Sequence, residues 1–487
     1  MARRPPVTHI TRRELTALAL AATGHGQVSR EALDPRGRIH IPIGIPNTLD
    51  TLKTFVEAEG AFSPGVGSFG VYVWVYMDGR LWFADNPQRG LRGNGMPVAW
   101  VRWRAGEADV EITIAEAQRE GAFYTAAVIR LRTPTKARIY AALRPLGPAG
   151  WDVKRLETDA AGSALFVDGH TALVGSSPSR AGVLAMDTVG ELALRALVPS
   201  QFEAESSAGD CSGALVWDVG SGEHEIEMIC PVLAGRRAAR HRWADARQNA
   251  MVDVADLNSP DEGELQPDIA LRPRAKAVIA EAESYWNRFY GDFSARMPDP
   301  RWAEALRAML AHAALAMNEG APDVAVVNYN VFNRDAVYVV SMLQKAGQWK
   351  LAAEALDYLM QHPFNGRAYP EADNPGQVLW SLGEQWLITR DREWLAHSYG
   401  AARQLARMIE YYRTTPGPHR VSMRGIGYGP GEPHELKPGR CDGFHPEYTE
   451  AFDIAGLRSA AVLAEASGSR EQAARWSGLA ERLFSEY

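Results

Sequence analysis

The pattern of apolar and polar positions divides the chain into a β-rich part and a helical part. In the β-rich part, short alternating runs occur, for example at 71–76 and 225–229. Asp78-Gly79 follows the first of these runs, and this dipeptide is typical of a hairpin turn. Short strands at intervals of about 10–15 residues predict a large antiparallel β-sandwich over residues 39–255. Further predicted strands cover 80–83, 98–104, 110–115, 123–131, 137–143, 164–167, 181–186, 213–219 and 223–231.

The helical part has apolar residues at the i, i+3, i+4 and i+7 spacing of amphipathic helices. Before it, residues 256–298 are interpreted as a linker rich in Pro, Asp, Glu and Gly, followed by a connecting helix at 275–293. From residue 299 to residue 487 the pattern is almost wholly helical. The predicted helices cover 300–318, 335–346, 348–362, 376–389, 392–412, 450–467 and 470–486.

Short turns and long polar loops alternate between these helices. The short turns lie near 346–349, 389–392 and 467–470, whereas the long loops end near 335, 374 and 450. In a series of antiparallel hairpins, all short turns then fall at one end and all long loops at the other. Polar loops on a rigid scaffold commonly carry binding and catalytic residues. We therefore expect a functional site at the long-loop end of an array with an inner and an outer layer of helices.

Composition limits the function classes. With 487 residues, the chain is long enough for two or more domains. A net charge of -7 argues against nucleic acid as the main partner, because phosphate binding needs a basic surface. No apolar stretch reaches the length of a membrane span, so no membrane partner is expected. Three cysteines do not make a disulfide framework, although Cys211 and Cys230 could pair in an exported protein.

The N-terminal segment, residues 1–38, leaves the localisation open. Arg12-Arg13 followed by an Ala/Leu-rich run at 15–22 resembles a twin-arginine export signal. The apolar run is short and no small-residue cleavage site follows it, so a surface helix of the protein fits as well. Both a cytoplasmic protein and one exported to the periplasm remain possible interpretations.

Several motifs resemble those of the six-hairpin glycosidases, in particular the glucoamylase-like and glycogen-debranching branch. They are Phe332-Asn333-Arg334-Asp335-Ala336-Val337-Tyr338, the Pro375–Glu384 segment and the Phe452–Ala461 segment, together with 52–56 and 62–70 in the sandwich. The resemblance implies a multidomain β + α protein, in which an N-terminal β-sandwich precedes an (α/α)6 toroid of helical hairpins. It implies a bacterial-type hydrolase of carbohydrate metabolism that needs no cofactor.

The resemblance also implies a sugar-binding role for polar residues at two helix starts. An Arg-Asp pair grips the terminal sugar ring in such enzymes, which points to Arg334 and Asp335 here. Forked guanidinium and carboxylate groups suit pairs of hydroxyls. The alternative is an ordinary helix start, capped by Asn333 or Asp335. Before the next helix, substrate contacts and a helix cap are equally open interpretations for Glu371, Asp373 and Gln377.

Glycoside hydrolysis needs a carboxylic acid that protonates the leaving oxygen and a second carboxylate. The family places this acid near the start of a later inner helix, which points to Glu447 and Glu450. Glu450 is preferred because it lies at the start of the predicted helix, directly before the part that bears Phe452 and Leu457, although a helix-start glutamate is also favoured by the helix dipole. In the loop before it, Tyr428 and Phe444 are expected to stack on sugar rings. The histidines and Cys441 of that loop match no metal-ligand spacing, so no metal is expected.

These observations predict an inverting, exo-acting glycosidase whose partner is an oligosaccharide or polysaccharide of the α-glucan type. Three alternatives stay open: a glycoside phosphorylase of the same architecture, a polysaccharide lyase using Tyr448 with His445, and a non-catalytic carbohydrate-binding protein. An (α/α)6 barrel needs twelve helices, whereas seven are predicted between 299 and 487. We therefore expect residues 299–487 to be the first half of such a barrel, with the catalytic base beyond Tyr487 and no activity in this chain alone.

Overall fold

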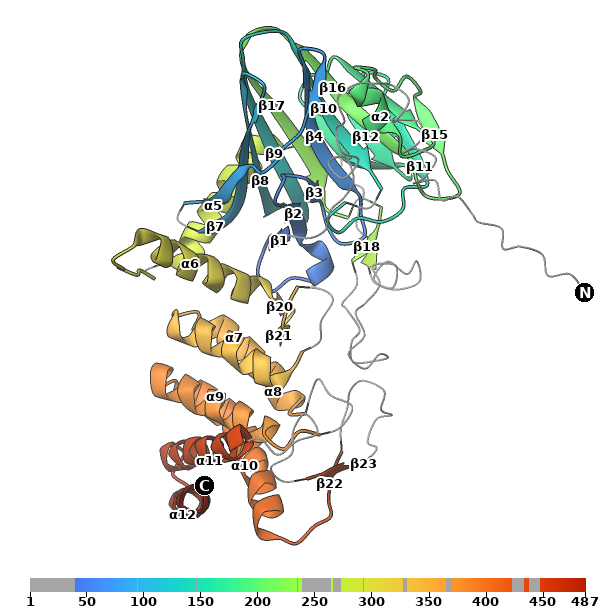
Figure 1. The fold of residues 1–487 in the computed structure, drawn as a ribbon. Coiled ribbons are helices and arrows are strands. Elements are labelled where there is room, and N and C mark those ends of the chain that lie inside the picture. The colour runs from blue at the N-terminus through green and yellow to red at the C-terminus, as the bar shows by residue number, and fades with distance from the viewer. Residues whose placement is uncertain are drawn as a thin grey trace, which may run out of the picture.

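The structure is a computed structural model that describes residues 40–93, 95–145, 147–233, 235–238, 264–265, 273–291, 293–326, 331–364, 370–422, 433–437 and 447–487. Within these residues, antiparallel sheets occupy the N-terminal part and helices the C-terminal part. The predicted mixed β and α composition is therefore confirmed. Figure 1 shows the sheets packed together above a row of helices. The expected export signal lies outside the described residues, and so does nearly all of the expected linker at 256–273.

Two large sheets form the described β part. The first has the order β1-β2-β3-β4-β10-β16-β14, with β5 paired to β4. Its strands are β1 (His40–Ile43), β2 (Thr54–Glu57), β3 (Phe62–Ser63), β4 (Gly70–Met77), β5 (Arg80–Trp82), β10 (Ala137–Arg144), β14 (Arg180–Leu184) and β16 (Ser212–Val219). The 3-10 helix η2 (Asp50–Leu52) precedes β2, and α2 (Val189–Leu194) follows β14.

The second sheet has the order β15-β11-β12-β13-β17-β9-β8-β7-β6. Its strands are β6 (Gln88–Arg92), β7 (Met96–Ala105), β8 (Ala108–Arg119), β9 (Ala122–Thr133), β11 (Arg155–Thr158), β12 (Ala164–Val167), β13 (His170–Gly175), β15 (Glu203–Glu205) and β17 (Gly222–Pro231). Short strand pairs complete the described sheets: β18 (Arg237–Ala238) with β19 (Glu264–Leu265), β20 (Met317–Asn318) with β21 (Ala321–Pro322), and β22 (His419–Ser422) with β23 (Pro433–Leu436).

The alternation of side chains along the strands explains how the sheets pack. In β4, Val71, Val73 and Val75 belong to the core between the sheets, while Tyr72 and Trp74 pack on the opposite face with α2. Successive residues of a strand point to opposite faces, so one strand can serve both layers. The predicted hairpin turn after β4 is confirmed, because Asp78 and Gly79 have φ of 53° and 73°, values that an Asp-Gly turn accommodates.

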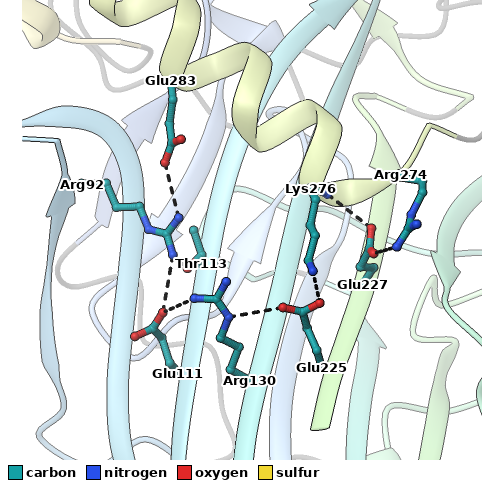
Figure 2. Close-up of polar contacts among 9 residues, drawn as sticks. All are labelled: Arg92, Glu111, Thr113, Arg130, Glu225, Glu227, Arg274, Lys276 and Glu283. Carbon is teal, nitrogen blue, oxygen red and sulfur yellow. Dashed lines mark hydrogen bonds and ion pairs between the residues drawn. The ribbon is translucent and has the colours of Figure 1, made fainter.

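Helix α5 (Ala275–Tyr290) packs on the outer face of the second sheet. Its apolar side, with Val278, Ile279 and Ala282, covers small residues of β8 and β9. Charged side chains surround this contact: Arg92 of β6 contacts Glu283 at 3.4 Å, and Lys276 and Arg274 pair with acidic residues of β17 (Figure 2). Exposed pairs of this kind contribute little individually. The predicted connecting helix is thus present and ends three residues before its expected end.

The remaining described helices pack together in the C-terminal part. Their bounds are α6 (Pro300–Leu315), α7 (Asn333–Lys345), α8 (Trp349–Gln361), α9 (Asn374–Thr389), α10 (Arg392–Thr414), α11 (Glu447–Ala466) and α12 (Arg470–Glu486). In Figure 1, α6, α7, α9 and α11 follow one another as a row below the sandwich. The helices share one apolar core, whose members include Leu379, Leu457 and Trp476. Helix α6 ends earlier than predicted, because the chain enters the β20–β21 hairpin. None of the described helices is long and apolar enough to cross a membrane.

Glycines allow α9 and α11 to cross closely. A Cβ at Gly376 would lie 2.4 Å from the carbonyl oxygen of Phe452, and one at Gly456 would lie 2.7 Å from Cα of Gly376. Such separations are far shorter than van der Waals contact, so only hydrogen at these positions permits the observed approach. The crossing matters for function because it sets the distance between the N-terminal ends of two helices that carry candidate site residues.

We predict that Gly376→Ala destabilises the protein by about 1–3 kcal/mol, because the added methyl group forces α9 and α11 apart. Gly478→Ala is a matched control, since Gly478 lies in α12 and a Cβ there meets nothing within 4 Å. The control is expected to be neutral or to stabilise by about 0.5–1 kcal/mol, because alanine is the better helix former. Urea-induced unfolding measures both values. Equal stability of the two variants would contradict the close crossing.

Candidate functional site

The N-terminal ends of α7, α9 and α11 meet at one end of the helical layers. Arg334 is the second residue of α7, Asp373 directly precedes α9, and Tyr448 is the second residue of α11. Arg334 contacts both of the others, although they are 39 and 114 positions away in the sequence. The long-loop end of the array therefore gathers polar side chains from three helices, which is the arrangement that the alternation of turns and loops predicts.

Arg334 lies between two buried carboxylates and an aromatic ring. Its Nη2 is 3.3 Å from Oε2 of Glu371, and its Nε is 3.3 Å from Oδ2 of Asp373. Its guanidinium carbon lies 5.1 Å from the ring centre of Tyr448, within cation–π range. The side chains of Glu371 and Asp373 are 3% and 0% exposed, whereas that of Arg334 is 23% exposed. The guanidinium is thus the accessible member of an otherwise buried charged group, called here the Arg334 cluster.

Gln377 completes the Arg334 cluster. Its Nε2 donates to Oδ2 of Asp373 at 2.7 Å, and its Oε1 accepts from the side-chain amide of Asn374 at 3.3 Å. Asp373 occupies the N-cap position of α9, but its carboxylate accepts no capping hydrogen bond from a backbone N–H of the first helical turn. The carboxylate instead faces Arg334 and Gln377. The geometry therefore favours a site residue over a helix cap at this position.

A second polar group lies beside the first, around Arg413 at the end of α10. Arg413 contacts Glu450 through Nη2 at 2.6 Å and Asp453 through Nε at 2.7 Å. The Asp453 side chain is 0% exposed, that of Arg413 is 11% exposed, and that of Glu450 is 34% exposed. This group is called the Arg413 cluster. It contains two carboxyl groups but one guanidinium, so Arg413 balances one negative charge.

Tyr412 connects the two clusters. Its hydroxyl lies 2.9 Å from the carbonyl oxygen of Ala372, between Glu371 and Asp373, and 2.7 Å from Oδ1 of Asp453. A hydroxyl has one proton to donate, and a backbone carbonyl can only accept. The single proton of the Tyr412 hydroxyl is therefore shared between the Ala372 carbonyl and Asp453, and these contacts fix the Asp453 carboxyl group beside Arg413.

Burial makes both Asp453 and Tyr412 weaker acids. Complete burial raises the pKa of Asp453 to about 7, and the nearby Arg413 only partly opposes this shift. Burial also raises the pKa of the Tyr412 hydroxyl well above its ordinary value. A carboxyl group that keeps its proton up to neutral pH next to a half-exposed glutamate is a feature of acid–base sites.

We predict that Asp453→Asn removes a pH dependence of stability. A carboxyl whose folded-state pKa is raised stabilises the fold fully below its unfolded pKa of about 4, and this contribution is lost as the pH rises towards 7. Relative to Asp453→Asn, the unmodified protein should therefore lose up to about 1.4 kcal/mol for each pH unit between 4 and 7. Chemical unfolding at several pH values measures the difference. Parallel stability curves would contradict a raised pKa at Asp453.

The other site residues that the sequence predicts lie outside the Arg334 and Arg413 clusters or outside the described residues. Asn333 is buried, and its side-chain amide donates to the carbonyl oxygen of Pro363 at 2.8 Å, so it holds the chain that follows α8. Asp335 is exposed in the first turn of α7, and the acidic partners of Arg334 are Glu371 and Asp373 instead. Glu447 is the exposed first residue of α11. Tyr428 and Phe444 lie outside the described residues.

Sequence reasoning missed Tyr412, Arg413 and Asp453. One signal was available: Asp453 is an acidic residue beside Ile454 on the apolar face of its helix, where a charge needs a partner. Arg413 lies 40 positions earlier, in the last turn of α10, and its role depends on the tertiary packing. Among the described residues, no three His, Cys, Asp or Glu side chains are grouped as metal ligands would be.

No model of a known protein family matches the sequence, and no curated protein matches it either. Among solved structures, a bacterial glucoamylase in complex with acarbose is similar with a TM-score of 0.52 and 14% identity, over 90% of this chain. This chain spans 65% of the length of that glucoamylase chain.

Two glycosidases have lower scores. The GH92 α-mannosidase from Bacteroides thetaiotaomicron in complex with mannoimidazole has a TM-score of 0.34 and 11% identity, over 92% of this chain. A gh92 family glycosyl hydrolase has a TM-score of 0.31 and 12% identity, over 91% of this chain. The matches cover 62% and 59% of those chains. At these identities, the similarity to the glucoamylase concerns the fold alone.

Proposed function

We propose that this protein is a glycoside hydrolase whose active site lies at the N-terminal ends of α7, α9 and α11. The observation that carries the proposal is the Arg334 cluster, in which a partly exposed guanidinium is held by two buried carboxylates beside the ring of Tyr448. A fixed guanidinium suits the recognition of sugar hydroxyls, and an aromatic ring beside it offers contact area for a sugar ring. Together they suit an uncharged polyol.

The fold supports the same proposal. The described helices follow a β-sandwich and share one apolar core, and a bacterial glucoamylase is similar in fold at a TM-score of 0.52. We propose that the helical layers belong to an (α/α)6 barrel and that the substrate is an oligosaccharide of the α-glucan type, cleaved from one end with inversion. The fold alone does not imply a function, so the argument rests on the residues of the site.

Glu450 is the proposed general acid, and Glu447 is the alternative. Glu450 lies one turn into α11, where Arg413 orients its carboxyl group, and the neighbouring Asp453 has a raised pKa. In the proposed reaction, the protonated form of Glu450 gives its proton to the leaving glycosidic oxygen while water attacks the anomeric carbon. The second carboxylate of an inverting enzyme takes the proton of that water. Glu447 is more exposed and is not held by the contacts that orient Glu450.

The test is hydrolysis of maltooligosaccharides and an aryl α-glucoside by the purified protein. Glu450→Gln is expected to lower kcat by about 10²–10⁴-fold, because general acid catalysis is lost while binding remains. Glu447→Gln is the matched control and should leave kcat within a few-fold of the unmodified enzyme. NMR of the first product should show the β-anomer if the reaction inverts. Loss of kcat in the control alone would make Glu447 the acid, and full activity of both variants would contradict the proposed site.

A further inference from the structure

The second sheet carries a concave region that the proposed active site does not use. Strands β7, β8, β9 and β17, with the loop between β5 and β6, enclose a shallow cavity of about 830 Å³. Protein cavities that hold ligands commonly measure about 300–1,000 Å³. The cavity lies on the outer face of the sheet, next to the area that α5 covers, and is called here the sheet-face cavity. The Arg334 cluster lies instead at the ends of α7, α9 and α11.

Opposite charges line the sheet-face cavity and pair with one another. Arg130 contacts Glu225 at 3.3 Å and Glu111 at 3.6 Å, and Arg102 also pairs with Glu111. Figure 2 shows Arg130 between these two glutamates. In all, four arginines and five carboxylates line the cavity, so the charges nearly cancel. A polyanion such as nucleic acid gains no net attraction here. Within the described residues, no set of three or more His, Cys, Asp or Glu side chains is arranged as a metal site would need.

Paired charges of this kind suit a neutral ligand with many hydroxyl groups. Each guanidinium retains donors, and each carboxylate retains acceptor positions, beyond those used in the ion pairs. A hydroxyl can donate to a carboxylate and accept from a guanidinium at once. The ion pairs also restrict the side chains before the ligand arrives, so less conformational entropy is lost on binding.

Trp100 supplies an aromatic surface next to the cavity. It pairs with Gly90 of the neighbouring strand, and a Cβ at Gly90 would lie 2.7 Å from Cζ2 of the indole ring. The ring therefore lies close against the sheet at a position that only glycine permits. The guanidinium carbon of Arg102, which lines the cavity, is 4.7 Å from the ring centre. Trp100 is half-buried, so part of its surface remains accessible.

We propose that the sheet-face cavity and Trp100 form a second binding site for a neutral polysaccharide chain. The accessible part of the Trp100 indole contacts the C–H-rich face of a sugar ring, while Arg102, Glu111, Arg130 and Glu225 bind hydroxyls. The site holds a long substrate on the sandwich and does not take part in bond cleavage. This inference rests on the proposed function only for the choice of an α-glucan as the sugar.

The test is retardation of the chain of residues 1–487 in native gels that contain glycogen. Trp100→Ala and Arg102→Ala are expected to weaken retention at least about tenfold, because each removes a central contact. Arg102 is largely exposed, so its variant should fold even if Trp100→Ala does not. Arg80→Ala is the matched control: Arg80 also stacks on a tryptophan, Trp82, but in the other sheet, and retention should not change. Thermal unfolding checks that each variant is folded.

The outcomes separate this inference from the proposed function. Arg334→Ala should keep glycogen retention while losing the binding of short maltooligosaccharides, measured by titration calorimetry. If Arg334→Ala removes all retention, or if Arg102→Ala and Trp100→Ala bind glycogen as the unmodified chain does, the second site is wrong and the proposed function stands. If retention depends on Trp100 and Arg102 but no variant or unmodified chain binds or cleaves short oligosaccharides, the second site stands and the proposed function fails. Absence of glycogen retention in the unmodified chain would overturn the inference.

Discussion

Replacing Arg334 with alanine is expected to lower the affinity for maltooligosaccharides by about 30-fold or more and to destabilise the protein. Loss of one partner of a largely buried charged contact costs about 2–5 kcal/mol in binding. In the free protein, the same change leaves Glu371 and Asp373 buried without their guanidinium, which costs about 3–5 kcal/mol. Titration calorimetry and chemical unfolding measure the two effects separately.

Two further variants separate the roles of Arg334. Arg334→Lys keeps the positive charge but loses the forked donors, so it should recover much of the stability while binding stays weakened about tenfold. Arg458→Ala removes an arginine whose ion pair with Glu481 is exposed, and it should cost less than about 1 kcal/mol with no effect on binding. An Arg334→Ala variant that binds sugar normally would exclude the Arg334 cluster from the site.

Replacing Lys53 with methionine is expected to have the largest effect on stability outside the candidate site. The Lys53 side chain is 0% exposed, and its Nζ donates to the carbonyl oxygens of Ile45 at 2.6 Å and Thr48 at 3.2 Å. Glu116, 1% exposed, attracts it electrostatically. Burial lowers the pKa of Lys53 to about 8 and raises that of Glu116 to about 8. Removing the ammonium group leaves the two carbonyl oxygens and Glu116 buried without this partner, at a cost of about 3–5 kcal/mol.

The contact of Lys53 also supports the junction between the sandwich and the helices. Its carbonyl partners flank Asn47, whose amide donates to Glu354 of α8 at 2.5 Å and whose oxygen accepts from Gly320 N at 2.7 Å. The double variant Lys53→Met with Glu116→Gln should recover part of the loss, because the glutamine still accepts from Thr54 N and carries no charge. Strictly additive effects of the two changes would show that Lys53 and Glu116 do not interact.

Elements that depend on near neighbours in the chain were predicted well. The strand at 71–76 and its Asp-Gly turn follow from alternation and from the backbone preference of two residues. The helices from 300 onward follow from apolar spacing, and six of them begin within two residues of the prediction; α11 begins three residues earlier, at Glu447. Short strands such as β1 and β13 were missed, because four to six residues carry too little pattern to distinguish a strand from a loop.

The candidate site was predicted in part. Arg334, Glu371, Asp373 and Gln377 lie in one cluster, as their positions at helix starts indicate. Asp335 was expected beside Arg334, yet it is exposed, since consecutive residues of a helix point in directions about 100° apart. The contacts of Glu450 with Arg413 required knowledge of how α10 and α11 pack, and the motifs contain no information on that packing.

The sequence by itself determined the order of elements, the β + α composition and the end of the helical array at which polar residues gather. These properties depend on residues a few positions apart, whose spacing sets the face on which each side chain lies. Only the tertiary structure decided which polar groups meet: Arg334 with Glu371 and Asp373, Arg413 with Asp453, and the charged lining of the sheet-face cavity. The physical reason is that burial and electrostatic pairing act through space, between segments that the chain alone leaves tens of residues apart.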